Sequence, residues 1–166
     1  MVELSDGMNA SVFRQKDFSW LFSVQFLGAF NDNVFKNGVL IFVAYQMSQT
    51  ESESGLLLNL AAGLFILPFV IFSPFSGALA DRTDKISLIQ KLKLAEVLIM
   101  LVAAGSIILE SLGGMLLTLF LMGSQSAFFG PVKYSILPQI VNTNSLTSAT
   151  SWFSGSTFLS ILLELF

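Results

Sequence analysis

The 166-residue sequence contains no cysteine and no histidine, and charged residues make up only 11% of it. The missing side chains exclude disulfides, thiolate or imidazole metal ligands and histidine acid–base chemistry within this sequence. Hydrophobic residues make up 54% of the sequence, and its mean hydropathy is +0.76. A chain of this size cannot bury so much apolar surface in one soluble core, so the composition predicts a polytopic membrane protein.

Apolar segments follow one another along the chain after a short polar tail, residues 1–17. We expect membrane spans at about residues 18–47, 55–80, 88–109, 115–132 and 145–166. The second span contains Pro68 and Pro74, which favour kinks. The last segment is still apolar where the sequence stops, so we expect about four complete transmembrane helices, an incomplete fifth and a longer parent protein.

Except for Lys36 in the first span, every Lys and Arg lies in or beside alternate polar segments of this predicted arrangement. The loops between spans one and two and between spans three and four carry only acidic charges, at Glu51, Glu53 and Glu110. Because Lys and Arg favour the cytoplasmic side, the pattern predicts a cytoplasmic N-terminus. The basic residues outside the first span are Arg14, Lys16, Arg82, Lys85, Lys91, Lys93 and Lys133.

The first span carries a polar run, FLGAFNDNVFKN at Phe26–Asn37, with Asp32 near the middle of the span. At 100° per residue, Gln25, Asp32 and Lys36 share one helical face. A charge at the bilayer centre costs roughly 2.5–3.5 kcal/mol, so such residues usually line a cavity or pathway. Asp32 and Lys36 could instead neutralise one another as an i,i+4 pair. We favour a cavity, because Gln25 and Asn33 extend the polarity beyond such a pair.

The polar turn between the second and third spans reads G-x-L-A-D-R-x-x-K, with Gly77, Asp81, Arg82 and Lys85 at the specified positions. It resembles the loop signature of the major facilitator superfamily, in which this loop acts as a conformational latch between two helical halves. Asp84 stands where that pattern usually has Gly, and Ile86 where it has a second basic residue. Asp tolerates turn geometry, so the turn is retained more surely than the charge network. Alone, the motif fits an ordinary positive-inside loop.

Two longer motifs, Phe26–Asn37 and FFGPVKYSILPQIV at Phe128–Val141, together resemble the lysophospholipid transporter branch of that superfamily. The resemblance implies an all-α membrane protein, the N-terminal part of a major facilitator helix bundle. It further implies that lysophospholipids, chiefly lysophosphatidylethanolamine, are flipped across the bacterial inner membrane by alternating access. Asp32, Asn33, Lys133 and Tyr134 stand at positions that match the motifs of the family.

A zwitterionic head group would offer its ammonium to Asp32 and its phosphate to a lysine. Lys133 could equally extend its ammonium to the membrane interface, and the small residues of 123–127 favour close helix packing. Asp32 with Asn31 and Asn33 could hold a coupling ion, Na⁺ or H⁺, and no other cofactor is expected. The expected partners are the lysophospholipid, membrane lipids, the missing C-terminal half and a fused or separate acyltransferase, but no nucleic acid.

Two other functions fit less of the sequence. The chain could be the membrane anchor of a glycerophospholipid acyltransferase fused after it, although it carries neither a His–Asp pair nor a glycine-rich nucleotide loop and is not expected to be an enzyme itself. It could also belong to a general major facilitator transporter of another small amphiphile. The polar turn permits that function, but the two longer motifs favour lysophospholipids.

The predicted topology can be tested by cysteine labelling, because the sequence has no cysteine of its own. Cysteines placed at Ser52 and Gly113 should react with a membrane-impermeant thiol reagent from the periplasm, since the loops there lack Lys and Arg. A cysteine at Thr83 should react only after the cytoplasmic side is opened. Labelling of Thr83→Cys from outside intact cells would overturn the arrangement.

Overall fold

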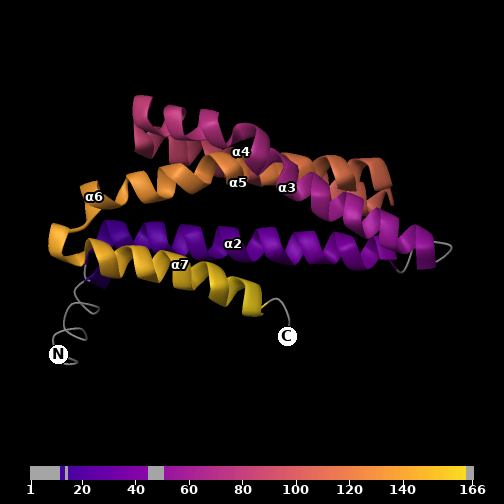
Figure 1. The fold of residues 1–166 in the computed structure, drawn as a ribbon, viewed down its shortest axis with the longest axis horizontal. Helices are drawn as coiled ribbons and strands as arrows, with labels where there is room; N and C mark the ends of the chain where they lie inside the picture. Colours follow the sequence, from indigo (N-terminus) through magenta and orange to yellow (C-terminus); the bar gives the residue numbers. More distant parts are fainter. Residues whose placement is uncertain (1–11, 14, 45–50, 164–166) are drawn as a thin grey trace. The chain divides into compact units, whose positions relative to one another are not determined.

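The computed structural model describes residues 12–13, 15–44 and 51–163. These residues form α-helices joined by short turns, and no strand occurs among them (Figure 1). The all-α fold class predicted from the sequence is confirmed for this part of the chain. The helices are α2 (Lys16–Phe42), α3 (Glu51–Arg82), α4 (Lys85–Ile108), α5 (Leu112–Ser135), α6 (Leu137–Ile140) and α7 (Leu146–Leu163), with the 3-10 helix η2 (Thr143–Ser145) before α7.

Helices α3, α4 and α5 begin earlier than the apolar segments suggest. The stretch Ser48–Ser54 was expected to be a loop, but α3 begins at Glu51. Residues 45–50 lie outside the described part. The predicted loop Glu110–Gly114 is shorter as well, because α5 begins at Leu112. Ser111 caps this helix by accepting a hydrogen bond from the Gly114 amide at 3.3 Å.

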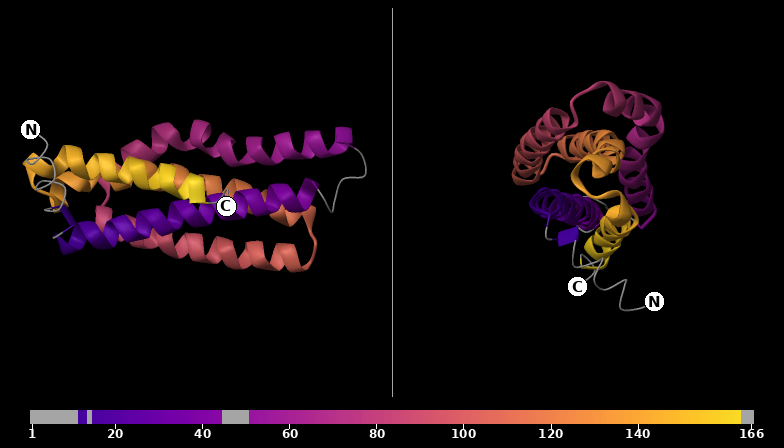
Figure 2. Two further views of the ribbon diagram at one scale, coloured as in Figure 1. Left: turned by 90° about the horizontal axis from the view of Figure 1, so that it is seen from below. Right: turned by 90° about the vertical axis from the view of Figure 1, so that its left-hand side faces the viewer.

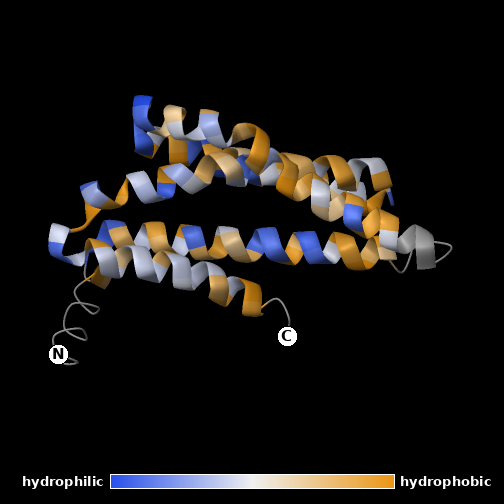
Figure 3. Cartoon of the chain, viewed as in Figure 1, coloured by the Kyte–Doolittle hydropathy of each residue, from blue (hydrophilic) through white to orange (hydrophobic). Residues whose placement is uncertain are grey.

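Length and hydropathy distinguish two helices from the others. Among the described residues, Gly55–Arg82 and Leu112–Ser135 are long and apolar enough to cross a membrane, with 28 and 24 residues. Pro68 and Pro74 lie inside α3, which nevertheless remains one continuous helix. In contrast, α2 has hydrophilic turns in its middle (Figure 3), which lower its hydropathy. Membrane crossing by α2, α4 and α7 stays a prediction.

The described chain falls into two compact units whose boundaries lie inside α2 and α5. The first unit contains the described residues up to Val34 together with those from Lys133 onward, and the second contains Phe35–Val132. Each unit has its own packed core, and each is described separately below.

Aromatic packing holds α7 against the first half of α2 in the first unit, and Figure 2 shows the two helices side by side. Phe18 and Phe153 are fully buried, with ring centroids 5.6 Å apart. Trp152 packs edge-on against Phe13 at 5.1 Å, a favourable geometry for aromatic pairs. Further along, the Ser160 hydroxyl donates to the Phe26 carbonyl at 3.3 Å. These contacts fix the position of α7 along α2.

The core of the second unit lies between the end of α2, α3 and α5, around Val39, Ala61, Met115 and Leu119. Close to this core, α5 approaches α3 so tightly that a side chain at Gly123 would collide with the backbone carbonyl of Phe65. This contact supports the interpretation of residues 123–127 as a close helix-packing face.

The close approach at Gly123 predicts a stability loss that other glycines should not show. Gly123→Ala should destabilise the full-length protein by about 1–3 kcal/mol, because the methyl group meets a carbonyl that cannot move without the helix. Gly105→Ala on α4 is the matched control, since nothing lies within 4 Å of its new methyl group. It should be neutral or stabilising by up to about 1 kcal/mol. Equal thermal unfolding of the two variants in detergent would contradict the close contact.

Candidate functional site

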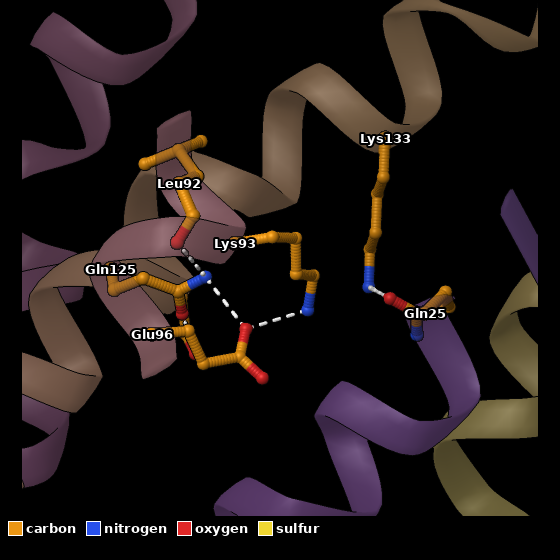
Figure 4. A network of polar contacts seen from close by, with 7 residues as sticks. Gln25, Leu92, Lys93, Glu96, Gln125 and Lys133 are labelled. Carbon is orange, nitrogen blue, oxygen red and sulfur yellow. Dashed lines mark hydrogen bonds and ion pairs between the residues drawn. The ribbon is translucent and has the colours of Figure 1, made fainter. Parts of the chain in front are cut away.

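Gln25 occupies the centre of the polar contacts in the first unit. Its side chain is only 2% exposed, and its Nε2 donates a hydrogen bond to Thr157 Oγ1 on α7 at 2.9 Å. Its Oε1 accepts a hydrogen bond from Lys133 Nζ at 3.1 Å (Figure 4). The structure therefore joins two of the predicted site residues, one in the first predicted span and one just after the fourth. It adds Thr157, which the sequence does not single out.

Lys133 and Tyr134 form the α5 side of this site. The Lys133 ammonium lies 5.3 Å from the centroid of the Tyr134 ring, within cation–π range. The Tyr134 hydroxyl lies 3.5 Å from Ser154 Oγ, and its ring is half-exposed. Lys133 was expected just past the end of the fourth span, at residue 132. It lies instead in the last turn of α5, which continues to Ser135.

The polar run of α2 continues at Asn31, Asp32 and Asn33, all of which are partly buried. Asn33 Nδ2 donates to the Ala29 carbonyl of the same helix at 2.8 Å. The Oδ1 atom of Asp32 is buried, and so is Asn31 Nδ2, which has no hydrogen-bond partner within the described ranges. Within the same ranges no three acidic side chains gather as a metal ion would require.

Lys36 lies one turn beyond Asp32 and belongs to the second unit. Its ammonium lies 5.8 Å from the centroid of the Phe65 ring on α3. A cation over an aromatic face is one way to lower the cost of a charge in an apolar setting. The ion pair between Asp32 and Lys36 considered from the sequence stays a prediction.

A polar cluster that the sequence analysis did not assign joins α4 to α5 in the second unit. Glu96 Oε2 accepts hydrogen bonds from Lys93 Nζ at 2.6 Å and from Gln125 Nε2 at 3.0 Å (Figure 4). Gln125 is 5% exposed, and Lys93 also lies 4.4 Å from the centroid of the Phe129 ring. Two signals in the sequence could have indicated it. Lys93 and Glu96 have the i,i+3 spacing of a helical ion pair, and Gln125 interrupts an apolar run.

The residues of the expected latch lie around the junction of α3 and α4. Asp81 and Arg82 are exposed in the last turn of α3, Gly77 lies five residues before its end, and Lys85 begins α4. The predicted turn Asp81–Ser87 is therefore shorter. Asp84 explains the early start of α4, because its carboxylate caps the helix by accepting from the Ser87 amide at 2.8 Å. The residue that departs from the family pattern thus stabilises a helix end.

Comparisons with known proteins agree with the two sequence motifs. The chain is 26% identical over 159 residues to the lysophospholipid transporter LplT of Cronobacter sakazakii, covering 96% of this chain and 37% of that protein. It is 28% identical over 142 residues to the proteins of that name from Yersinia pestis and Yersinia pseudotuberculosis, covering 84% of this chain and 32% of each. No family model and no solved structure matches.

These similarities confirm the predicted resemblance to lysophospholipid transporters. They extend over most of this chain, whereas the chain spans only about a third of the length of the curated relatives it matches. Together with two helices long and apolar enough to cross a membrane, they support a membrane protein of the transporter class.

The ion pair between Lys93 and Glu96 predicts a specific pattern of stability. Glu96→Gln leaves a partly buried ammonium without its carboxylate and should cost about 1–3 kcal/mol of unfolding free energy. Adding Lys93→Met removes the second charge, so the double variant should recover most of that loss. Thermal unfolding of the full-length protein in detergent would measure both changes.

Lys91→Met is the matched control, because Lys91 is exposed on the same helix. It should unfold like the unmodified protein. If Glu96→Gln also unfolded at the unmodified temperature, the cluster would have no role in holding α4 to α5.

Proposed function

We propose that the full-length protein moves lysophospholipids, including lysophosphatidylethanolamine, across the bacterial inner membrane, and that this chain forms part of the N-terminal half of the transporter. The observation that carries this proposal is the similarity of 84–96% of the chain to proteins named lysophospholipid transporters. Because those relatives are named as transporters, transport is preferred to a role as the membrane anchor of an enzyme. A fused acyltransferase remains compatible with this function.

Recognition of the lipid head group would use opposite charges on neighbouring elements of the first unit. The Lys133 ammonium donates to Gln25 and lies beside the Tyr134 ring, and in this proposal it donates to a phosphate oxygen of the head group. Asp32 lies seven residues after Gln25, about two helical turns along the same face of α2. Its carboxylate would receive the ammonium of an ethanolamine head group.

Asn31 supports a ligand in the same region of α2. Its buried Nδ2 has no hydrogen-bond partner among the described residues. An unsatisfied buried donor costs about 1–3 kcal/mol, so an acceptor is expected to complete it. A head-group oxygen would do so in the loaded transporter. A coupling ion, Na⁺ or H⁺, would bind at the Asp32 carboxylate.

Transport would proceed by alternating access with the N-terminus in the cytoplasm. The exposed carboxylate of Asp81 and the guanidinium of Arg82, at the end of α3, are placed where they can contact another part of the protein. Contacts made in only one of two states shift the balance between those states. In this proposal Gly77, Asp81, Arg82 and Lys85 form the latch that favours one orientation of the transporter.

Asp32 gives the sharpest test of the proposed function. Asp32→Asn keeps the shape of the side chain and removes its charge, so uptake of lysophosphatidylethanolamine should fall about 10–100-fold, the equivalent of one lost charge-assisted contact. If Asp32 meets the head-group ammonium, uptake of lysophosphatidylglycerol, which has no ammonium, should fall much less. If Asp32 binds the coupling ion, uptake of both lipids should fall equally.

The double variant Asp32→Asn with Lys36→Gln separates these roles from a purely structural pair. Removing both charges at once should restore normal membrane insertion if the two residues only neutralise each other. Under the proposed function the double variant should be well inserted and still inactive in uptake. Recovery of transport in that variant would contradict the assignment of Asp32 to the transport site.

A further inference from the structure

A groove with a volume of about 270 Å³ lies beside the start of α2 in the first unit, open to the surroundings. The side chains that line it are Phe13, Lys16, Ser19, Trp20 and Ser23. The four that belong to α2 are spaced i, i+3, i+4 and i+7, so they form one stripe along the helix. The groove therefore lies on a single face of α2.

The same stripe becomes apolar further along α2. Leu27 and Val34 follow at i+11 and i+18 from Lys16, with exposed fractions of 62% and 45%. The buried residues Phe18 and Gln25 lie on the opposite face at 100° per residue. Leu27 lies about 16 Å beyond Lys16 along the helix axis, within the roughly 20 Å that one leaflet spans with its head groups. The order of polar and apolar groups on this stripe matches that of a phospholipid.

Trp20 and Lys16 give the groove the character of a membrane interface. Trp20 is 74% exposed, and an exposed indole near the end of a spanning helix is typical of the head-group region. Lys16 is exposed, and no ion pair or hydrogen bond of its side chain occurs within the described ranges. The neighbouring acid Asp17 lies on another side of the helix, because adjacent residues do not face each other. The groove therefore favours a negatively charged ligand.

The two serines restrict the ligand further. The Ser19 hydroxyl donates to the Phe13 carbonyl at 2.8 Å, and the Ser23 hydroxyl donates to the Ser19 carbonyl at 2.9 Å. Because a hydroxyl has only one proton, both oxygens can offer the groove only their acceptor positions. A ligand that complements the groove thus combines an anion for Lys16 with hydrogen-bond donors for the serines.

We propose that this stripe of α2 binds a phosphatidylglycerol molecule of the surrounding bilayer. The phosphate meets Lys16, and the two hydroxyls of the glycerol head group donate to Ser19 and Ser23. Trp20 lies against the ester region, and an acyl chain follows Leu27. Phosphatidylethanolamine also carries donors, but it has no net negative charge to complement the lysine.

This lipid site differs from the proposed transport site, because Gln25 and Asp32 lie on the opposite face of α2. The inference requires that α2 enters the membrane as predicted. It does not require that the protein carries lysophospholipids.

Quenching of tryptophan fluorescence by brominated lipids tests the site in the full-length protein. The protein is reconstituted into two bilayers with equal amounts of phosphatidylglycerol and phosphatidylethanolamine, and only one of the two lipids carries bromine near the head-group end of its acyl chains. The difference between the unmodified protein and Trp20→Phe gives the contribution of Trp20. Brominated phosphatidylglycerol should quench it more, as expected for an enrichment of about fivefold beside one basic residue.

Substitution of Lys16 tests the charge. Lys16→Gln should make the quenching of Trp20 equal in the two bilayers, because neither lipid is then preferred. Lys91→Gln is the matched control, since Lys91 is also exposed but lies on α4. The positions one turn away from Lys91 carry no aromatic ring, being Ser87, Leu88, Leu94 and Ala95. This control should keep the preference for phosphatidylglycerol.

Substitution of Ser23 tests the acceptors. Ser23→Ala should lower the preference about two- to threefold, the effect of one net hydrogen bond. Ser151→Ala is the matched control, because the exposed Ser151 makes the same kind of bond, to the Thr147 carbonyl of α7 at 2.9 Å. If the two variants showed the same preference, the choice of a glycerol head group would be wrong.

Two results with the unmodified protein would overturn the lipid site. Equal quenching of Trp20 in the two bilayers would show contact with the membrane but no selective site. Absence of quenching in both would show that another part of the full-length protein covers this stripe. Neither measurement involves transport, so a protein that carries no lysophospholipid could still show the selective quenching, and the lipid site and the proposed function can fail separately.

Discussion

The need to satisfy polar side chains inside an apolar helix bundle shapes the described contacts of this chain. A polar group that loses water and gains no partner costs several times the net value of an ordinary hydrogen bond. Gln25 meets this constraint through contacts to two other helices, and Asn33 meets it through a carbonyl of its own helix. Glu96 is satisfied by donors from both α4 and α5. Polar residues in the apolar segments therefore determine which helix faces meet.

Two lysines, one in each unit, have different described contacts. Lys93 is paired with the carboxylate of Glu96, so its charge is cancelled and the contact can hold helices together. Lys133 donates to the amide oxygen of Gln25 and lies beside the ring of Tyr134. A charge that is paired within the protein suits a structural contact, and recognition of a phosphate by Lys133 stays a proposal.

The sequence predicts the helices well because hydropathy and helix length are local properties. It also places Gln25 on the polar face of α2 and identifies Lys133 through its motif. It does not predict Thr157, which lies 132 residues from Gln25, because nothing local to α7 indicates its partner. The contact of Gln125 with Glu96 is missed for the same reason. The helix starts at Lys85 and Leu112 depend on side-chain hydrogen bonds of the capping residues Asp84 and Ser111. A hydropathy pattern does not detect such bonds.

The initial rate of lysophosphatidylethanolamine translocation by the full-length protein in proteoliposomes tests the central claim most directly. The unmodified protein should move the lipid, Lys133→Met should lose nearly all of that rate, and the double variant Lys93→Met with Glu96→Gln should retain it. This pattern would show that Lys133 serves transport and that the pair of Lys93 with Glu96 serves the fold. Translocation by Lys133→Met at the unmodified rate, or no translocation by the unmodified protein, would contradict the account.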